Sequence, residues 1–145
     1  MLEDNIAFIA NYFWERSIKN INNTLSDKQA GSFNMNDYYY LTSIYQLGTP
    51  KLGELAAKLN LTKPAISALV RRLEKNELII KTQSEQDKRV YHVSLTDKGI
   101  KIIEGDNKLY LELSNLISEL LTKEEVNKTD ELLLQIVAKL KEKQL

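Results

Sequence analysis

The stretch that most constrains the fold of this chain is residues 62–76, which have the pattern of a single amphipathic helix. Thr62 can begin the helix, because its hydroxyl can accept one of the amide N–H groups that a first turn leaves unpaired. Pro64 suits that first turn, where a missing N–H costs little. Four apolar residues follow at the i, i+3, i+4, i+7 spacing of one buried face: Ile66, Leu69, Val70 and Leu73.

The opposite face of this helix combines small residues with cations. It carries Pro64, Ala68, Arg71 and Lys75, flanked by Lys63, Ser67 and Arg72. Small side chains let a helix approach a charged surface closely, and the cations hold it there. A phosphate-lined DNA groove has that shape and charge. Taken alone, the face could also be an ordinary solvated surface.

The segments on either side of this helix complete a recognisable unit. Residues 52–59 form a short amphipathic helix, and Asn60-Leu61 joins it to the next helix, as in a helix-turn-helix. Residues 78–83 and 89–95 are strand-like runs around the polar turn 84–88. Two strands after such a helix make a wing. The predicted fold is therefore mostly α with a small β wing, a winged helix-turn-helix.

The wing carries the most specific motif of the chain. Asp87-Lys88-Arg89, followed by Leu95-Thr96 and Gly99, resembles the MarR family of bacterial transcription regulators. The resemblance includes Leu55-Ala56 to Leu59, the helix 62–73 and Leu78-Ile79, and it extends more loosely to the flanking helices. Where such proteins usually have a glycine, this chain has Asn76-Glu77. We expect Asn76 to take the left-handed conformation that ends the helix.

Charge is distributed unevenly along this neutral chain. Residues 49–101 contain eleven Lys or Arg and six Asp or Glu, a net charge of +5, so the remainder carries −5. The basic part coincides with the predicted winged helix. This asymmetry is expected of a protein with a DNA-facing lobe and a separate acidic lobe.

Helices are also predicted outside the winged helix. They cover residues 2–26, 36–47 with Asn36 as cap, 96–121 with Thr96 as cap, and a last helix opened by the capping box 122–125; residues 27–34 are predicted to be a loop. In the last helix, five apolar residues form a predicted buried stripe: Val126, Leu133, Ile136, Val137 and Leu140.

The terminal helices offer more apolar surface than the winged helix can cover. We therefore predict one MarR-like domain over 1–145, with a DNA-binding lobe at 36–99 and a helical dimerisation lobe from 1–30 and 100–145. A two-fold dimer would place two recognition helices in successive major grooves, so the target would be an inverted repeat. The alternative is a monomer whose terminal helices fold back on the winged helix.

The resemblance also implies roles for single residues. Arg89 corresponds to the wing arginine at the minor groove and Asp87 to the carboxylate that orients it, whereas a plain turn salt bridge is the alternative. Lys88 is expected to contact phosphate, and Arg71 or Arg72 could bind a guanine edge. The predicted DNA-binding set is Thr62, Lys63, Pro64, Ser67, Ala68, Arg71, Arg72, Lys75, Asp87, Lys88 and Arg89.

Similar proteins often bind small aromatic or lipidic effectors between the dimer helices and the winged helix. Tyr12, Phe13, Tyr39 and Tyr40 could line such a crevice, although they are most simply core and interface residues.

The sequence gives little support for an enzyme, a cofactor or a metal site. There is no cysteine, His92 is the only histidine, and no catalytic arrangement or phosphate-binding loop is present. No run of apolar residues is long enough for a membrane span, so we expect a cytoplasmic protein. The sequence thus favours a homodimeric DNA-binding regulator, expected to be a repressor controlled by a small hydrophobic or aromatic effector. A winged helix for protein–protein contact, and a hydrophobic-ligand-binding protein without DNA function, remain as alternatives.

Overall fold

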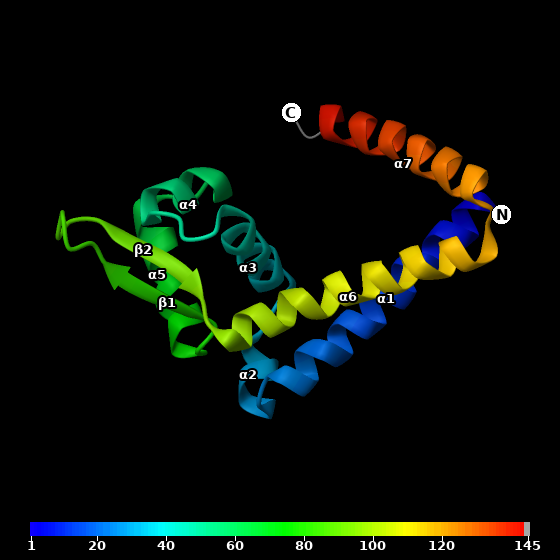
Figure 1. Ribbon diagram of the computed structural model, residues 1–145. Coiled ribbons are helices and arrows are strands. Elements are labelled where there is room, and N and C mark those ends of the chain that lie inside the picture. Colours follow the sequence, from blue (N-terminus) through cyan, green and yellow to red (C-terminus); the bar gives the residue numbers. More distant parts are fainter. Residues whose placement is uncertain (144–145) are drawn as a thin grey trace. The chain divides into compact units, whose positions relative to one another are not determined.

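The computed structural model describes residues 1–143 (Figure 1), and the chain divides into two compact units, 1–107 and 108–145. The elements are α1 (Leu2–Thr24), α2 (Asp27–Ser32), α3 (Met35–Leu47), α4 (Leu52–Leu59), α5 (Lys63–Lys75), β1 (Ile79–Gln83), β2 (Tyr91–Leu95), α6 (Asp97–Leu120) and α7 (Lys123–Lys143). Within residues 1–143, no helix combines the length and apolar character needed to cross a membrane.

The helix-turn-helix forms as predicted. Helix α4 ends at Asn60, whose left-handed backbone (φ 52°) turns the chain sharply toward the next helix. Thr62 then caps α5, since its Oγ1 accepts a hydrogen bond from the amide of Ala65 at 3.4 Å. The four apolar residues of the predicted stripe in α5 are all buried. The opposite face of α5 is consequently left outside the core.

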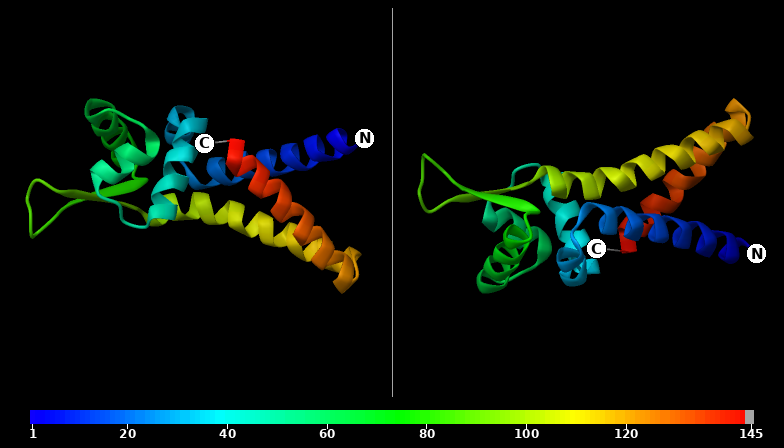
Figure 2. Two further views of the ribbon diagram at one scale, coloured as in Figure 1. Left: turned by 90° about the horizontal axis from the view of Figure 1, so that it is seen from above. Right: turned by 90° about the horizontal axis from the view of Figure 1, so that it is seen from below.

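The wing is an antiparallel hairpin of β1 and β2. Ile79 lies opposite Leu95 and Gln83 opposite Tyr91 in the register of the pair. The strands are slightly shorter than predicted, and only Val93 of β2 is fully buried, as expected for a half-buried strand. Seen from two sides, the hairpin extends beyond α4 and α5 (Figure 2). Its tip is therefore free of the core of the first unit.

The core of the first unit joins α3, α4, α5 and the hairpin to the end of α1 and the start of α6. Its fully buried apolar side chains are Leu41, Ile44, Leu55, Ile66, Leu73, Leu78, Ile79, Val93 and Ile102. Helices α1 and α6 lie side by side at Asn20, whose Nδ2 donates to the carbonyl oxygen of Ile102 at 3.1 Å. One helical turn away along both helices, Ser17 Oγ of α1 donates to the buried carboxylate of Asp106 of α6 at 3.0 Å. These bonds attach the winged helix to the first helix of the chain.

Three local predictions in the first unit are wrong. Residues 27–34 are not a loop, because α2 forms there with Ser26 as cap and the Gln29 side chain bonded to the Ser26 amide. The cap of α3 is Asn34, two residues earlier than predicted, since its Oδ1 accepts from the amide of Asp37 at 3.1 Å. After α5, the positive φ (60°) occurs at Glu77, while Asn76 has φ −84°.

The second unit contains the end of α6 and α7. Thr122 opens α7 with the predicted capping box: Glu125 Oε2 accepts from the Thr122 amide at 2.8 Å, and Thr122 Oγ1 accepts from the Glu125 amide at 3.4 Å. The apolar stripe of α7 is not buried as predicted. Leu133, Ile136, Val137 and Leu140 are between 43% and 55% exposed. The apolar face of α7 is therefore formed but uncovered in the single chain.

Two glycines allow a matched test of the packing between the wing and α6. A Cβ at Gly99 would lie 2.3 Å from the carbonyl oxygen of Leu78, a backbone atom, whereas a Cβ at Gly53 meets nothing within 4 Å. We expect Gly99→Ala to destabilise the protein by about 1–3 kcal/mol through this clash. Gly53→Ala should be neutral or stabilising by about 0.5–1 kcal/mol, because alanine favours the helix. Thermal unfolding of both variants measures the difference, and equal melting temperatures would contradict the close approach.

Candidate nucleic-acid interface

The exposed face of α5 has the composition predicted for it. Thr62, Lys63, Pro64, Ser67, Ala68, Arg71 and Lys75 are all exposed. Ser67 Oγ donates to the carbonyl oxygen of Lys63 at 2.9 Å, which keeps this hydroxyl close to the helix backbone. Among residues 1–143, no salt bridge involves Lys63, Arg71 or Lys75. The face thus presents cations whose charge is not neutralised by the protein.

Arg72 is the exception among the predicted cations. Its Nη1 donates to Asp37 Oδ2 at 2.7 Å, and its Nη2 donates to Asp37 Oδ1. The side chain of Asp37 is fully buried, whereas that of Arg72 is 38% exposed. The hydrogen bonds to Asp37 raise the pKa of Arg72. Because a bidentate pair occupies the fork of the guanidinium, the structure argues against the predicted guanine contact, and we remove Arg72 from the proposed DNA-binding set.

Arg72 instead connects the recognition helix to α3. Asp37 lies in the first turn of α3, and its Oδ2 also accepts from the Asn34 amide at 3.0 Å. The sequence could not show this pair, because the two residues are far apart in the chain and only the fold brings them together. The pair fixes the orientation of α5 relative to α3.

At the tip of the wing, Asp87, Lys88 and Arg89 are all exposed. Asp87 Oδ1 accepts from the backbone amide of Arg89 at 2.9 Å, so this carboxylate shapes the turn. Within residues 1–143 no salt bridge joins this carboxylate to the Arg89 guanidinium, so the orienting role of Asp87 stays a prediction. The turn is further fixed by Gln83, whose Nε2 donates to the Lys88 carbonyl oxygen at 2.7 Å.

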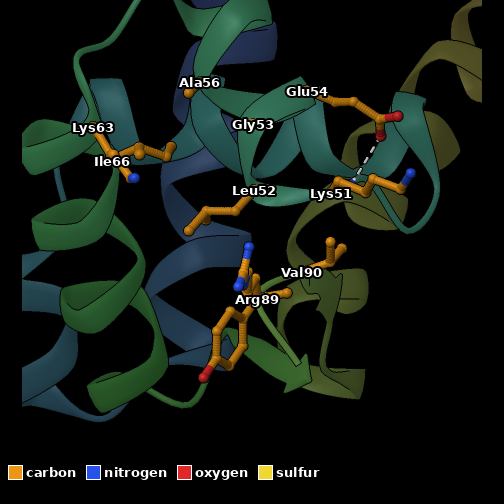
Figure 3. Close-up of a pocket in the computed structure, with 10 residues that line it drawn as sticks. Lys51, Leu52, Gly53, Glu54, Ala56, Lys63, Ile66, Arg89 and Val90 are labelled. Atoms are coloured by element: carbon orange, nitrogen blue, oxygen red, sulfur yellow. Dashed lines mark hydrogen bonds between the residues drawn. The ribbon is translucent and has the colours of Figure 1, made fainter. Parts of the chain in front are cut away.

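A hollow of about 590 Å³ lies between α4, the start of α5 and the wing (Figure 3). Its lining residues are Lys51, Leu52, Gly53, Glu54, Ala56, Lys63, Ile66, Arg89, Val90 and Tyr91. Lys63 and Arg89, predicted independently on the helix and on the wing, border this one space. The Arg89 side chain extends from the wing toward Leu52. Helix α5 and the wing therefore present cations to the same surface.

Lys51 is a neighbouring cation that the sequence prediction missed. It precedes α4 and pairs with His92 of the wing through an isolated β-bridge. Lys51 lies at the end of the loop before α4, and no local sequence pattern predicts that this residue lies beside the wing.

Side chains from α2 and α6 hold the C-terminal end of α5. Lys98 Nζ donates to Glu77 Oε2 at 2.9 Å, and Gln29 Nε2 donates to the Asn76 carbonyl oxygen at 3.0 Å. The hydrogen bond from Lys98, together with its charge and a further bond from Gln29, lowers the pKa of Glu77. The helix that carries the predicted contacts is thus held at both ends.

The four predicted effector residues include two pairs of neighbouring aromatic rings. The rings of Tyr12 and Phe13 are 6.0 Å apart on α1, and those of Tyr39 and Tyr40 are 6.0 Å apart on α3. A separate cavity of about 310 Å³ lies among α1, α2 and α3, and residues such as Trp14, Phe33 and Tyr38 line it. None of the four predicted residues borders that cavity.

A two-helix motif with a cationic exposed face, followed by a hairpin with cations at its tip, defines a winged helix-turn-helix protein. A sequence model of the MarR family matches residues 33–91. The regulator MhqR of Bacillus subtilis is 30% identical over 107 residues, which are 71% of each chain. The chain therefore belongs to the MarR family. The B. subtilis repressor MdtR is 34% identical over 61 residues, covering 42% of this chain and 39% of MdtR.

Further sequence alignments and solved structures agree with the winged helix-turn-helix fold. Alignments with YkoM and YsmB, two B. subtilis proteins named as HTH-type transcriptional regulators, cover 58% and 65% of those proteins. The S. aureus MepR–DNA complex has a TM-score of 0.67 at 22% identity, over 94% of this chain and 96% of MepR. The structure of S. aureus MepR bound to ethidium bromide has a TM-score of 0.66 at 22% identity. The alignment covers 97% of this chain and 96% of MepR. The four B. subtilis relatives are all named as HTH-type transcriptional regulators or repressors.

Proposed function

We propose that this chain is a homodimeric transcription regulator that binds an inverted-repeat operator through α5 and the wing. The proposal rests mainly on one observation. Lys63 of α5 and Arg89 of the wing line the same hollow, so the cations of helix and wing lie on one surface. Exposed phosphate-binding cations beside small residues suit a DNA groove. The proposed contact set is Thr62, Lys63, Pro64, Ser67, Ala68, Arg71, Lys75, Asp87, Lys88 and Arg89.

A dimer is supported by apolar surface that the single chain leaves uncovered. On α1, Ile6 and Phe8 are 58% and 71% exposed, and on α7 the stripe from Leu133 to Leu140 is also exposed. The α7 residues recur at the spacing of one helix face, and an exposed apolar face of this kind marks an interaction surface. A two-fold dimer would set two copies of α5 about one turn of DNA apart, roughly 34–36 Å.

We expect Leu133→Asp combined with Val137→Asp to produce a monomer, because charges would have to be buried in the apolar interface. Light scattering after gel filtration gives the mass directly. Gln135→Asp is the matched control, since residue 135 lies on the other side of α7 from both positions at helical spacing. A dimer with both substitutions at positions 133 and 137 would rule out this face as the interface.

We further propose that the protein acts in the cytoplasm as a repressor whose operator overlaps a promoter, under control of a small hydrophobic or aromatic effector. The name of MdtR supports repression, and the ethidium complex of MepR supports an effector of this kind. An effector would act by favouring a dimer in which the two copies of α5 no longer match the DNA spacing.

Selection of bound fragments from a random duplex pool tests the DNA-binding proposal. The expected result is an inverted repeat with half-sites about 10–10.5 base pairs apart, and an affinity that falls steeply with salt. Absence of any enriched sequence, together with a salt-insensitive protein partner, would instead indicate a protein–protein module. Tight binding of a hydrophobic ligand without DNA binding would indicate a ligand-binding protein.

A further inference from the structure

A series of polar contacts runs from the recognition helix α5 to α1 by way of α3 and α6. On α3, Asp37 pairs with Arg72 of α5. The next residue, Tyr38, turns to the other side, and its hydroxyl donates to Oδ2 of Asp106 on α6. The Ser17 hydroxyl of α1 donates to the same oxygen at 3.0 Å. Adjacent residues in the first turn of α3 thus connect the recognition helix to the two helices that support the winged helix.

The carboxylate at the centre of this series is buried and incompletely paired. Asp106 is 7% exposed, and within residues 1–143 its Oδ1 has no hydrogen-bond partner and no salt bridge involves the side chain. Burial of such a group costs folding free energy. Hydrogen bonds to a carboxylate oxygen are strong and directional, so this group fixes the geometry of its two donors.

Asp106 supplies the second of two fixed points between α1 and α6. The first is Asn20, whose Nδ2 donates to the Ile102 carbonyl oxygen at 3.1 Å and lies 2.1 Å from where a Cβ at Gly105 would be. One point of contact leaves two helices free to rotate about it. The surrounding apolar contacts favour burial without fixing a direction. The hydrogen bonds from Ser17 and Tyr38 to Asp106 remove that freedom and include α3 in the same geometry.

We propose that Asp106 is a positioning residue that sets the orientation of the winged helix on α1 and α6. The consequence for DNA rests on the proposed function, because the orientation of α5 in each copy determines the distance between the two copies in a dimer. A dimer gains from its second half-site only where the geometry allows both to be engaged together. Asp106, Tyr38 and Ser17 lie outside the proposed DNA contacts, so their loss should change the preferred half-site spacing and not the affinity for one half-site.

Four variants separate this role from simple stabilisation. Tyr38→Phe removes one donor and keeps the ring, and Tyr39→Phe is the matched control, because the same change falls on the next side chain, which is 53% exposed. Both donors use Oδ2, so Asp106→Asn can keep an acceptor oxygen for both of them. Asp106→Leu has a similar size and no acceptor.

Operator binding is compared on three duplexes at a temperature where every variant is folded: the selected spacing, the same half-sites with two base pairs inserted between them, and a single half-site. The natural chain, Tyr39→Phe and Asp106→Asn should prefer the selected spacing by about tenfold or more. In Tyr38→Phe and Asp106→Leu this preference should shrink by about threefold or more, with half-site affinity within twofold of the natural value and an unchanged salt slope. A residue that only stabilises the fold would leave the spacing preference unchanged.

A measurement without DNA tests the orientation itself. The chain has no cysteine, so spin labels can be attached at Lys19→Cys on α1 and Glu74→Cys on α5, both exposed positions of the first unit. Dilution with unlabelled chain restricts the measured distances to one molecule. Pulsed electron resonance should give a distance distribution about twofold wider in Tyr38→Phe and unchanged in Tyr39→Phe.

The two measurements distinguish failure of the positioning role from failure of the proposed function. A wider distribution in Tyr38→Phe, with no DNA binding by the natural chain, would support the positioning role and refute the proposed function. DNA binding with the same distribution and the same spacing preference in Tyr38→Phe would overturn the positioning role and leave the proposed function intact. A loss of half-site affinity in Tyr38→Phe would make this residue a DNA contact and would also overturn the positioning role.

Discussion

Replacing Arg89 with alanine is expected to reduce operator affinity at least tenfold and to flatten its dependence on salt. Arg89 is exposed at the tip of the wing, and the turn that presents it is fixed by Asp87 and Gln83. A narrow minor groove concentrates negative potential, and the permanent charge of an arginine suits it. Removing one phosphate-neutralising cation lowers the salt slope by about 1.

Fluorescence anisotropy at several salt concentrations measures both the affinity and the slope. Lys101→Ala provides the matched control, because it also removes one exposed cation but lies on α6, outside the proposed contact set. The mass of the protein in solution should be the same for both variants and the natural chain. If Arg89→Ala bound the operator as tightly as the natural chain, the wing would have no role in DNA binding.

Replacing Arg72 with leucine is expected to cost stability, about 3 kcal/mol, and to lower the melting temperature by roughly 10 °C. Without Arg72, the carboxylate of Asp37 would remain fully buried with only the Asn34 amide as a described hydrogen-bond donor. Leaving a buried charge without its partner costs more folding free energy than the ion pair contributes to stability. Thermal unfolding by circular dichroism measures the loss.

The double variant Asp37→Asn with Arg72→Leu tests that explanation. A neutral amide at position 37 removes the stranded charge, so the double variant should recover at least half of the lost stability. At a temperature where all three proteins are folded, the salt slope of DNA binding should be the same, because Arg72 is engaged with Asp37 and not with phosphate. A loss of salt slope in Arg72→Leu would instead restore Arg72 to the DNA contacts.

The errors of sequence prediction have identifiable causes. Gly31 and its polar neighbours favour a loop over residues 27–34, although Ser26 and Gln29 carry the capping pattern of a helix start. The same kind of local signal, Asn34 with Asp37, marks the true start of α3. Both capping signals lie in the sequence, but Gly31 with its polar neighbours favours a loop at the first, and Asn36 offers a competing cap at the second.

The uncovered stripe of α7 is a different case. The periodicity of Leu133, Val137 and Leu140 correctly predicted an apolar face, yet periodicity does not say which molecule covers it. The structure of one chain leaves these residues exposed. The pattern therefore supports the dimer as a proposal, and the single chain alone does not test it.

Local patterns along the chain are enough to predict the winged helix-turn-helix, the exposed cationic face of α5 and the Asp87-Lys88-Arg89 tip of the wing. Caps, turns and apolar periodicity act between residues a few positions apart, so they can be recognised along the chain. Two features become visible only in the folded chain: Arg72 pairs with Asp37, and Lys51, Lys63 and Arg89 border one hollow. Those contacts join residues distant in sequence, and their energies depend on burial and direction, which exist only once the helices and the hairpin have packed.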